Sequence, residues 1–181
     1  HTATSGFVDI QLKIQQQPRA QNSISAIRLM HETPKKARKE LDAATRAFKK
    51  GDRATAIEHL EKAAESDPEN FDVASNLGAL YLQERNPEKA VPWLEKAHRI
   101  DPFDAGNNIN YSAYYANLGE YAKAEDHANA GLKADPASVR GRFMLAVALV
   151  KQGKNVDSAR AHLDQIQNQF APARSLLMTL M

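Results

Sequence analysis

The residues best suited to chemistry in this sequence are its six histidines, because imidazole ligates metal ions and exchanges protons near neutral pH. The sequence contains a pattern that repeats about every 34 residues, described below. His59, His127 and His162 occupy the same position in different copies of this pattern, and Trp93 occupies that position in the copy between His59 and His127. Ligands of one metal ion lie about 2 Å from it, whereas residues that recur in successive helical units are at least a helix diameter apart, roughly 10 Å. We therefore predict no metal site and interpret these histidines as surface residues.

No other set of residues indicates catalysis. The chain has no cysteine, which excludes disulfides, thiol catalysis and cysteine-ligated zinc. It contains no phosphate-binding loop, dinucleotide fingerprint or nucleophile motif. Paired acids such as Glu125-Asp126 are adjacent in sequence, so on a helix they point in different directions and do not flank one bond. We predict that the protein is not an enzyme and binds no cofactor.

Composition and charge narrow the range of partners. The chain has 181 residues, 43% hydrophobic and 25% charged, and no run of about 18 apolar residues, so we expect no direct membrane insertion. Residues 1–40 hold seven Lys/Arg against three Asp/Glu, residues 139–181 six against two, and residues 41–138 eleven against seventeen. Neither end has a dense basic block or basic residues interleaved with aromatics, so nucleic acid is not an expected partner.

The chain begins at His1 rather than Met. It shows no basic segment followed by an apolar stretch at that end, and we interpret it as a processed or trimmed piece of a longer protein. A bacterial periplasmic or cell-surface location follows if a signal peptide was removed, and a cytoplasmic one otherwise. The sequence leaves the compartment open.

An Asp-Pro pair recurs with a fixed spacing of 34 residues, at Pro68, Pro102 and Pro136. Each unit contains two helix-length segments with apolar residues at i, i+3, i+4 and i+7. A turn separates the segments at Gly51-Asp52, Asn86-Pro87 and Gly119-Glu120. Gly suits the left-handed residue that ends a helix, and Pro after Asn suits a first helical turn with its cap. Asp-Pro then stops the second helix of each unit.

These units resemble the tetratricopeptide repeat, a helix–turn–helix of 34 residues. The second unit matches best, through Leu77-Gly78, Tyr81, Ala90, Leu94, Ala97 and Pro102. Small residues recur where the two helices cross closely, at Ala56, Ala63, Ala124 and Gly131. The resemblance implies four repeats within residues 34–172, at 37–70, 71–104, 105–138 and 139–172, and the fourth needs one extra residue in its turn. We expect an all-α, right-handed solenoid, with residues 173–181 as a capping helix.

Residues 1–33 differ in kind from the repeats. The segment FVDIQLKI alternates apolar and polar residues, with Val8, Ile10, Leu12 and Ile14 on one face, which is a strand pattern. ISAIRLMH, residues 24–31, is a second and weaker strand candidate, and Thr33-Pro34 would cap the first repeat helix and begin its first turn. An isolated two-stranded hairpin is only marginally stable. The β-prone extension is therefore a remnant of an upstream domain, an extension folded onto the repeats, or a homodimer contact through residues 7–29.

In the repeat family, ligands usually lie along the concave surface lined by the first helices. That resemblance assigns one set of positions to a partner-binding groove: Leu41, Thr45, Phe48, Ser75, Asn76, Ala79, Leu82, Ile109, Asn110, Ala113, Ala116, Phe143, Val147 and Val150. Family members that hold acidic chaperone tails use Lys and Asn at several of these places. Leu41 and Thr45 stand there in this chain, so the carboxylate clamp is absent, although Asn76 and Asn110 occupy positions where Asn often helps to bind a peptide.

The function that we predict is a non-catalytic scaffold, which binds a protein or peptide segment in an apolar concave groove. Its expected anchors are Phe48, Leu82, Ile109 and Phe143. One alternative is a structural or assembly module, whose groove is filled by residues 7–29 or whose extension pairs with a second copy. Another is an accessory repeat domain of a larger envelope-associated protein. Part of the set is also expected to be repeat–repeat core.

Overall fold

The structure, a computed structural model, describes residues 25–180. Every regular element in this range is a helix, and none is long and apolar enough to cross a membrane. The helices are α2 (Ala26–Met30), α3 (Lys35–Lys49), α4 (Arg53–Ser66), α5 (Phe71–Gln83), α6 (Pro87–Ile100), α7 (Ala105–Asn117), α8 (Tyr121–Ala134), α9 (Val139–Lys151), α10 (Val156–Asp164) and α11 (Ala171–Met178).

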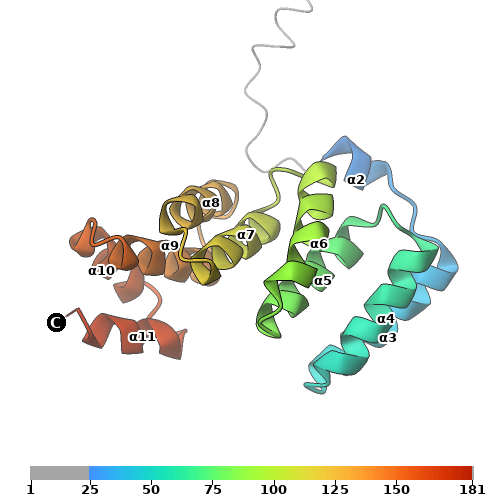
Figure 1. The fold of residues 1–181 in the computed structure, drawn as a ribbon, viewed down its shortest axis with the longest axis horizontal. Helices are drawn as coiled ribbons and strands as arrows, with labels where there is room; N and C mark the ends of the chain where they lie inside the picture. The colour runs from blue at the N-terminus through green and yellow to red at the C-terminus, as the bar shows by residue number, and fades with distance from the viewer. Residues whose placement is uncertain (1–24, 181) are drawn as a thin grey trace, which may run out of the picture.

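Helices α3 to α10 form four helical hairpins in succession, and α11 follows at the C-terminal end (Figure 1). The expected turns lie between the paired helices. Gly51 and Gly119 both adopt the left-handed conformation, with φ of 79° and 78°, which glycine reaches without a steric penalty. The Asn86 side chain caps α6 by accepting a hydrogen bond from the Lys89 amide, and Pro87 is the first helical residue. The all-helical repeat fold expected from the spacing is therefore confirmed.

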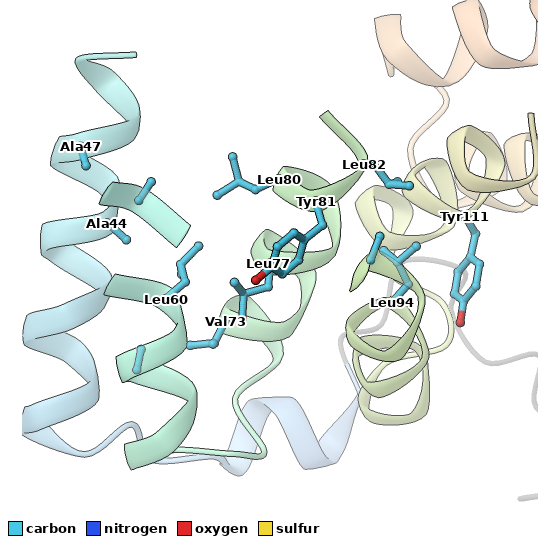
Figure 2. Close-up of a cluster of buried hydrophobic side chains, with 13 residues drawn as sticks. Ala44, Ala47, Leu60, Val73, Leu77, Leu80, Tyr81, Leu82, Leu94 and Tyr111 are labelled. Atoms are coloured by element: carbon cyan, nitrogen blue, oxygen red, sulfur yellow. The ribbon is translucent and has the colours of Figure 1, made fainter. Parts of the chain in front are cut away.

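The core lies between the hairpins and is built from small and aliphatic side chains. Figure 2 shows Leu60, Val73 and Leu77 lying together between α4 and α5, and Leu94 of α6 belongs to the same cluster on the other side of α5. The helices of the second hairpin approach closely at Gly78, where an added Cβ atom would lie 2.5 Å from Leu94 Cδ2. The small residues expected at the crossings are accordingly buried.

The strand expected at residues 24–31 is wrong. Ala26–Met30 form the short helix α2, because the Ser25 hydroxyl accepts a hydrogen bond from the Arg28 amide and caps it. The stronger strand pattern, at residues 7–14, lies outside the described residues.

The expected cap of the first repeat helix is also different. Helix α3 begins at Lys35 with Pro34 as its N-cap, and no side chain caps it. Thr33 is used elsewhere, because its Oγ1 accepts a hydrogen bond of 2.9 Å from Asn70 Nδ2. This contact joins the start of α3 to the loop before α5.

Candidate functional site

An open groove of about 340 Å³ lies between the first hairpin and α5. Its wall is mainly apolar, and its polar groups are the side chains of Thr45, Asn76 and Gln83. The full lining is Leu41, Ala44, Thr45, Phe48, Ala56, Leu60, Asn76, Ala79, Leu80 and Gln83. Phe48 is 50% exposed at the rim, an unusually open position for a large aromatic side chain.

The groove exists because α3 of the first hairpin (α3 and α4) does not pack closely against α5. In the described part of the chain, α5 packs along α7 and α7 along α9, whereas α3 and α5 make no comparable contact; α4 provides the contact instead. Figure 2 shows Leu80 projecting from α5 toward the first hairpin, where Ala44 and Ala47 offer only small side chains. The small side chains leave the space that larger ones would fill.

Residues 25–33, hereafter the N-terminal strap, cross the loops that precede α5 and α7. The Ser25 hydroxyl donates to the Ile100 carbonyl at 2.6 Å. The Arg28 guanidinium donates to Asp104 at 2.8 Å and to Asp72 at 3.1 Å, and it lies 3.7 Å from the ring centroid of Phe71. A charged fork that meets carboxylates and an aromatic face together makes a well-defined attachment.

The strap also uses the aspartates of two Asp-Pro pairs. His31 Nε2 lies 2.9 Å from the Asp67 carboxylate, and Arg28 approaches Asp101 at 3.5 Å. Both aspartates are buried, whereas Asp135 of the third pair is exposed. The first two Asp-Pro pairs therefore hold the strap in addition to ending helices α4 and α6.

The tetratricopeptide repeat profile matches residues 41–105 and 114–174. The chain belongs to the tetratricopeptide repeat family. The Protein STIP1 homolog of Dictyostelium discoideum is 30% identical over 141 residues, which are 77% of this chain and 25% of that protein. The chain thus spans a quarter of that relative's length.

Two solved structures share the tetratricopeptide repeat fold with this chain. The crystal structure of MamA has a TM-score of 0.64 at 20% identity and covers 80% of each chain. The first repeat domain of Spaghetti (RPAP3), solved with the HSP90 peptide SRMEEVD, has a TM-score of 0.63 at 18% identity, covering 69% of this chain and 99% of that one. At these identities the similarity concerns the fold.

The first two repeats bring part of the predicted groove together. Leu41, Thr45, Phe48 and Asn76 line one space, together with Ala79. Sequence reasoning missed the residues that α4 and the neighbouring positions of α5 add to the wall, namely Ala56, Leu60, Leu80 and Gln83. On α5 the groove is lined by Asn76, Ala79, Leu80 and Gln83, and the expected Ser75 and Leu82 are not part of the lining.

Other predicted groove residues are placed in the core. Leu82 is 6% and Ile109 4% exposed, and Ser75 is half-buried outside the groove. Asn110 is also buried, and its side-chain oxygen accepts a hydrogen bond of 2.8 Å from Arg140. These four residues face repeat neighbours in this structure and do not line the open groove.

The C-terminal segment covers the corresponding side of the fourth repeat. The Phe143 ring packs edge-to-face on Phe170, with centroids 5.0 Å apart. Val150 joins the same cluster as Leu176 and Leu177 of α11, and Val147 is half-buried. The open groove described above is lined by residues of the first two repeats.

The interpretation of the histidines as free surface residues is wrong for His127. Its ring packs beside both Tyr111 and Tyr115, with centroids 4.9 and 5.4 Å away, and the two tyrosine rings lie 6.1 Å from each other. Burial lowers the pKa of His127, and the nearby His98 lowers it further. The second repeat has Leu at the position of Tyr111. In the third repeat the Tyr111 ring provides an aromatic face against which the imidazole packs. Within residues 25–180 no group of three or more His, Asp or Glu side chains is arranged to hold a metal ion.

Proposed function

We propose that the chain is a non-catalytic protein–protein interaction scaffold that binds a short apolar segment of a partner in the groove beside Phe48. The observation that carries this proposal is the open, mainly apolar space between the first hairpin and α5, with a half-exposed aromatic ring at its rim. Exposed apolar surface of this kind is characteristic of interaction sites, and aromatic side chains commonly act as interface anchors.

The shape and chemistry of the groove indicate the kind of segment that fits. Its volume of about 340 Å³ accommodates a few apolar side chains. Thr45, Asn76 and Gln83 supply hydrogen-bonding groups at the wall, and such groups suit the backbone of a bound peptide. No Lys or Arg belongs to the lining residues of this groove. An apolar segment therefore fits it better than the acidic tail in the RPAP3 peptide complex.

The N-terminal strap supports an open groove. Its residues lie along the loops before α5 and α7, whereas the groove is lined by α3, α4 and α5 alone. The described part of the N-terminal extension therefore does not fill the groove. Residues 7–24, which the internal-plug alternative also requires, lie outside the described residues.

Selection of binding peptides by the full chain tests the proposal. Random peptides of about 12 residues are displayed on phage, and the affinity of the selected sequences is measured by fluorescence anisotropy. We expect selected peptides to share apolar anchor residues. Phe48→Glu should weaken their binding by at least about tenfold, because a charge replaces the anchor surface.

Phe103→Glu is the matched control, because Phe103 is 52% exposed and lies in the loop between α6 and α7. It should bind the selected peptides like the unmodified chain. Equal loss of affinity in both variants, or retention in both, would place the peptide site away from the groove and contradict the proposal. Circular dichroism establishes that each variant keeps its helical content.

A further inference from the structure

The outward side of α3 carries a concentrated positive charge. Residues 35–50 contain seven basic residues and two acidic ones, and all seven basic side chains are exposed. The basic residues are Lys35, Lys36, Arg38, Lys39, Arg46, Lys49 and Lys50. At 3.6 residues per turn, all except Lys36 fall within an arc of about 120°. The exposed Asp42 also falls within this arc, and the buried Ala37 and Ala44 lie opposite it. We call the arc the basic face, because six of its charged residues are basic and one is acidic.

The basic side chains of this face form no ion pair in the described chain, although, after the hydrogen bonds with His59 and Thr55, Lys39 and Lys50 contribute to lowering the pKa of Glu40 and of Asp52. Basic side chains in other helices pair with acids, such as Lys62 with Glu58 at 2.6 Å and Arg160 with Asp157 at 3.7 Å. None of the seven basic residues at 35–50 forms an ion pair with another residue in the range 25–180. Glu40, one of the two acids in this stretch, is already hydrogen-bonded to His59 at 2.7 Å.

Part of the basic face borders a depression of about 480 Å³ on the first hairpin. Lys39, Arg46 and Lys50 lie along it. The rest of the lining is Glu40, Ala43, Ala47, Asp52, Thr55 and His59, so three basic residues face two acidic ones there. None of the residues lining the groove beside Phe48 also lines this depression. Because α3 belongs to the hairpin at one end of the solenoid (Figure 1), this side of the helix is not covered by another repeat.

We propose that the basic face of α3 is a second interaction surface, which binds an acidic polypeptide segment. The 15 residues of α3 extend over roughly 22 Å, and Lys39, Arg46 and Lys50 recur along that length on one side. Carboxylates repeated along a helix or an extended chain would meet these cations in turn. The proposal is independent of the groove, because the two surfaces share no residue.

The side chains around the basic face favour a polypeptide over two other anionic partners. No aromatic side chain lies within the arc, although single-stranded nucleic acids are typically held by stacking of bases on aromatic rings. The larger apolar side chains of α3, Leu41 and Phe48, line the groove and lie on one side of the basic face only. A helix that lies on a membrane instead has an apolar face to bury between its basic flanks.

Fluorescence anisotropy with a defined probe tests this surface on the full chain. The probe is a labelled peptide of about 20 residues, with Glu at every third or fourth position and Ala elsewhere. The test variant is Lys39→Glu, Arg46→Glu and Lys50→Glu combined. We expect the unmodified chain to bind the probe and the variant to bind at least about tenfold more weakly, because three attractions become repulsions.

The matched control is Lys133→Glu, Lys151→Glu and Lys154→Glu combined, which changes the net charge equally at three exposed lysines of the third and fourth repeats. It should retain the affinity of the unmodified chain. An equal loss in both variants would show attraction to total charge alone and overturn the proposal. Stronger binding of the unmodified chain to anionic vesicles or to single-stranded DNA than to the peptide, lost in the α3 variant, would also overturn it.

A variant with neutral substitutions shows whether loss of binding comes from lost charge and not from misfolding of the Glu variant. Lys39→Gln, Arg46→Gln and Lys50→Gln combined removes the charge without introducing acids on the exposed side. It should also weaken binding of the acidic peptide, by less than the Glu variant. Binding of the Phe48-dependent peptides should be unchanged in this variant, so a failure of the second surface is distinguishable from a failure of the groove.

Discussion

Gly131 is required by the distance between neighbouring helices. A Cβ atom at this position would lie 2.7 Å from Ile109 Cγ1 and 3.1 Å from the Ala105 carbonyl oxygen. We predict that Gly131→Ala lowers the free energy of unfolding by about 1 kcal/mol or more. Overpacking costs about 1–3 kcal/mol, while the higher helix propensity of Ala returns at most about 1 kcal/mol.

Urea denaturation measures this change, and Gly106→Ala is its control. An added Cβ at Gly106 meets only Asp104 Oδ1, at 3.3 Å, and Gly106 is exposed. This control should be as stable as the unmodified chain or more stable. A Gly131→Ala variant of unchanged stability would mean that α7 and α8 separate at little cost.

His127 makes the stability of the third repeat depend on pH. Burial, followed by the nearby His98, lowers its pKa from the ordinary value of 6.5. As pH falls, the unfolded chain therefore binds a proton at this residue before the folded chain does. The stabilisation is complete above about pH 6.5 and is lost as pH falls through the folded-state pKa. Asp126 beside it acts in the opposite direction but is a smaller influence.

We predict that the free energy of unfolding declines between about pH 7.5 and about pH 5.5. His127→Phe should reduce that decline, because a phenyl ring can still pack beside Tyr111 and Tyr115 but does not titrate. Urea denaturation at the two pH values gives the comparison. Part of the decline should remain, since burial also lowers the pKa of His162. A decline of the same size in the variant would show that other groups cause it.

At the scale of the element, α2 depends on the contacts of one side chain. A helix of five residues is not stable in isolation, and its Ile27, Leu29 and Met30 are exposed. Arg28 is its main attachment, through Asp72, Asp104 and the Phe71 ring. We predict that Arg28→Ala increases hydrogen exchange of residues 26–31 to the rate of an unstructured segment.

The same variant should lower the free energy of unfolding by about 1–2 kcal/mol, because Asp101 stays buried with one charged partner fewer. Arg38→Ala is the control, since within residues 25–180 the Arg38 guanidinium has a single hydrogen bond, to the Thr33 carbonyl at 3.3 Å. It should leave exchange in α2 unchanged. If α2 remains protected in Arg28→Ala, the Ser25 contacts hold it and Arg28 does not.

The repeat helices were predictable from sequence because local signals determine them. Apolar periodicity, the turns at Gly51 and Gly119 and the Asn86-Pro87 start all act within a few residues. Helix α2 was not predictable in this way, since Arg28 finds its partners 44 to 76 residues away. The basic residues of the strap and the acidic residues of the Asp-Pro pairs are evident in the sequence. Which of them form contacts is determined only by the folded structure.

The groove was predictable only in part for a related reason. The periodicity marks which residues of the first helices face inward, and it correctly brought Leu41, Thr45 and Phe48 to one place. It does not specify how far neighbouring repeats stand apart. The spacing is set by contacts between hairpins, which leave Phe48 exposed but bury Ile109.

At the scale of the whole molecule, the two ends of the solenoid differ. The C-terminal segment covers the fourth repeat through Phe170 and α11. At the other end, the strap attaches beside the groove and leaves it open. The open groove lies at this end of the described chain, between the first hairpin and α5.

The N-terminal strap connects the start of α3 to the start of α5. Thr33, just before α3, is hydrogen-bonded to Asn70, which caps α5. Toward the other end of α5, the Tyr81 hydroxyl donates a hydrogen bond of 2.5 Å to Glu61 of α4. The ion pair there, between the half-exposed Arg53 and Glu84 at 3.9 Å, is a surface pair of the kind that contributes little. We therefore expect the strap to limit movement of the first hairpin against α5.

This expectation is measurable because the chain has no cysteine. Spin labels at Thr45→Cys and Gln83→Cys, which stand on opposite walls of the groove, report the spacing of α3 from α5 by pulsed electron resonance. Combining them with Arg28→Ala and Thr33→Val should broaden the distance distribution, whereas Arg160→Ala at the far end should not. An unchanged distribution in the strap variant would mean that α4 packing on α5 alone sets the groove width, since the measurement needs no bound peptide.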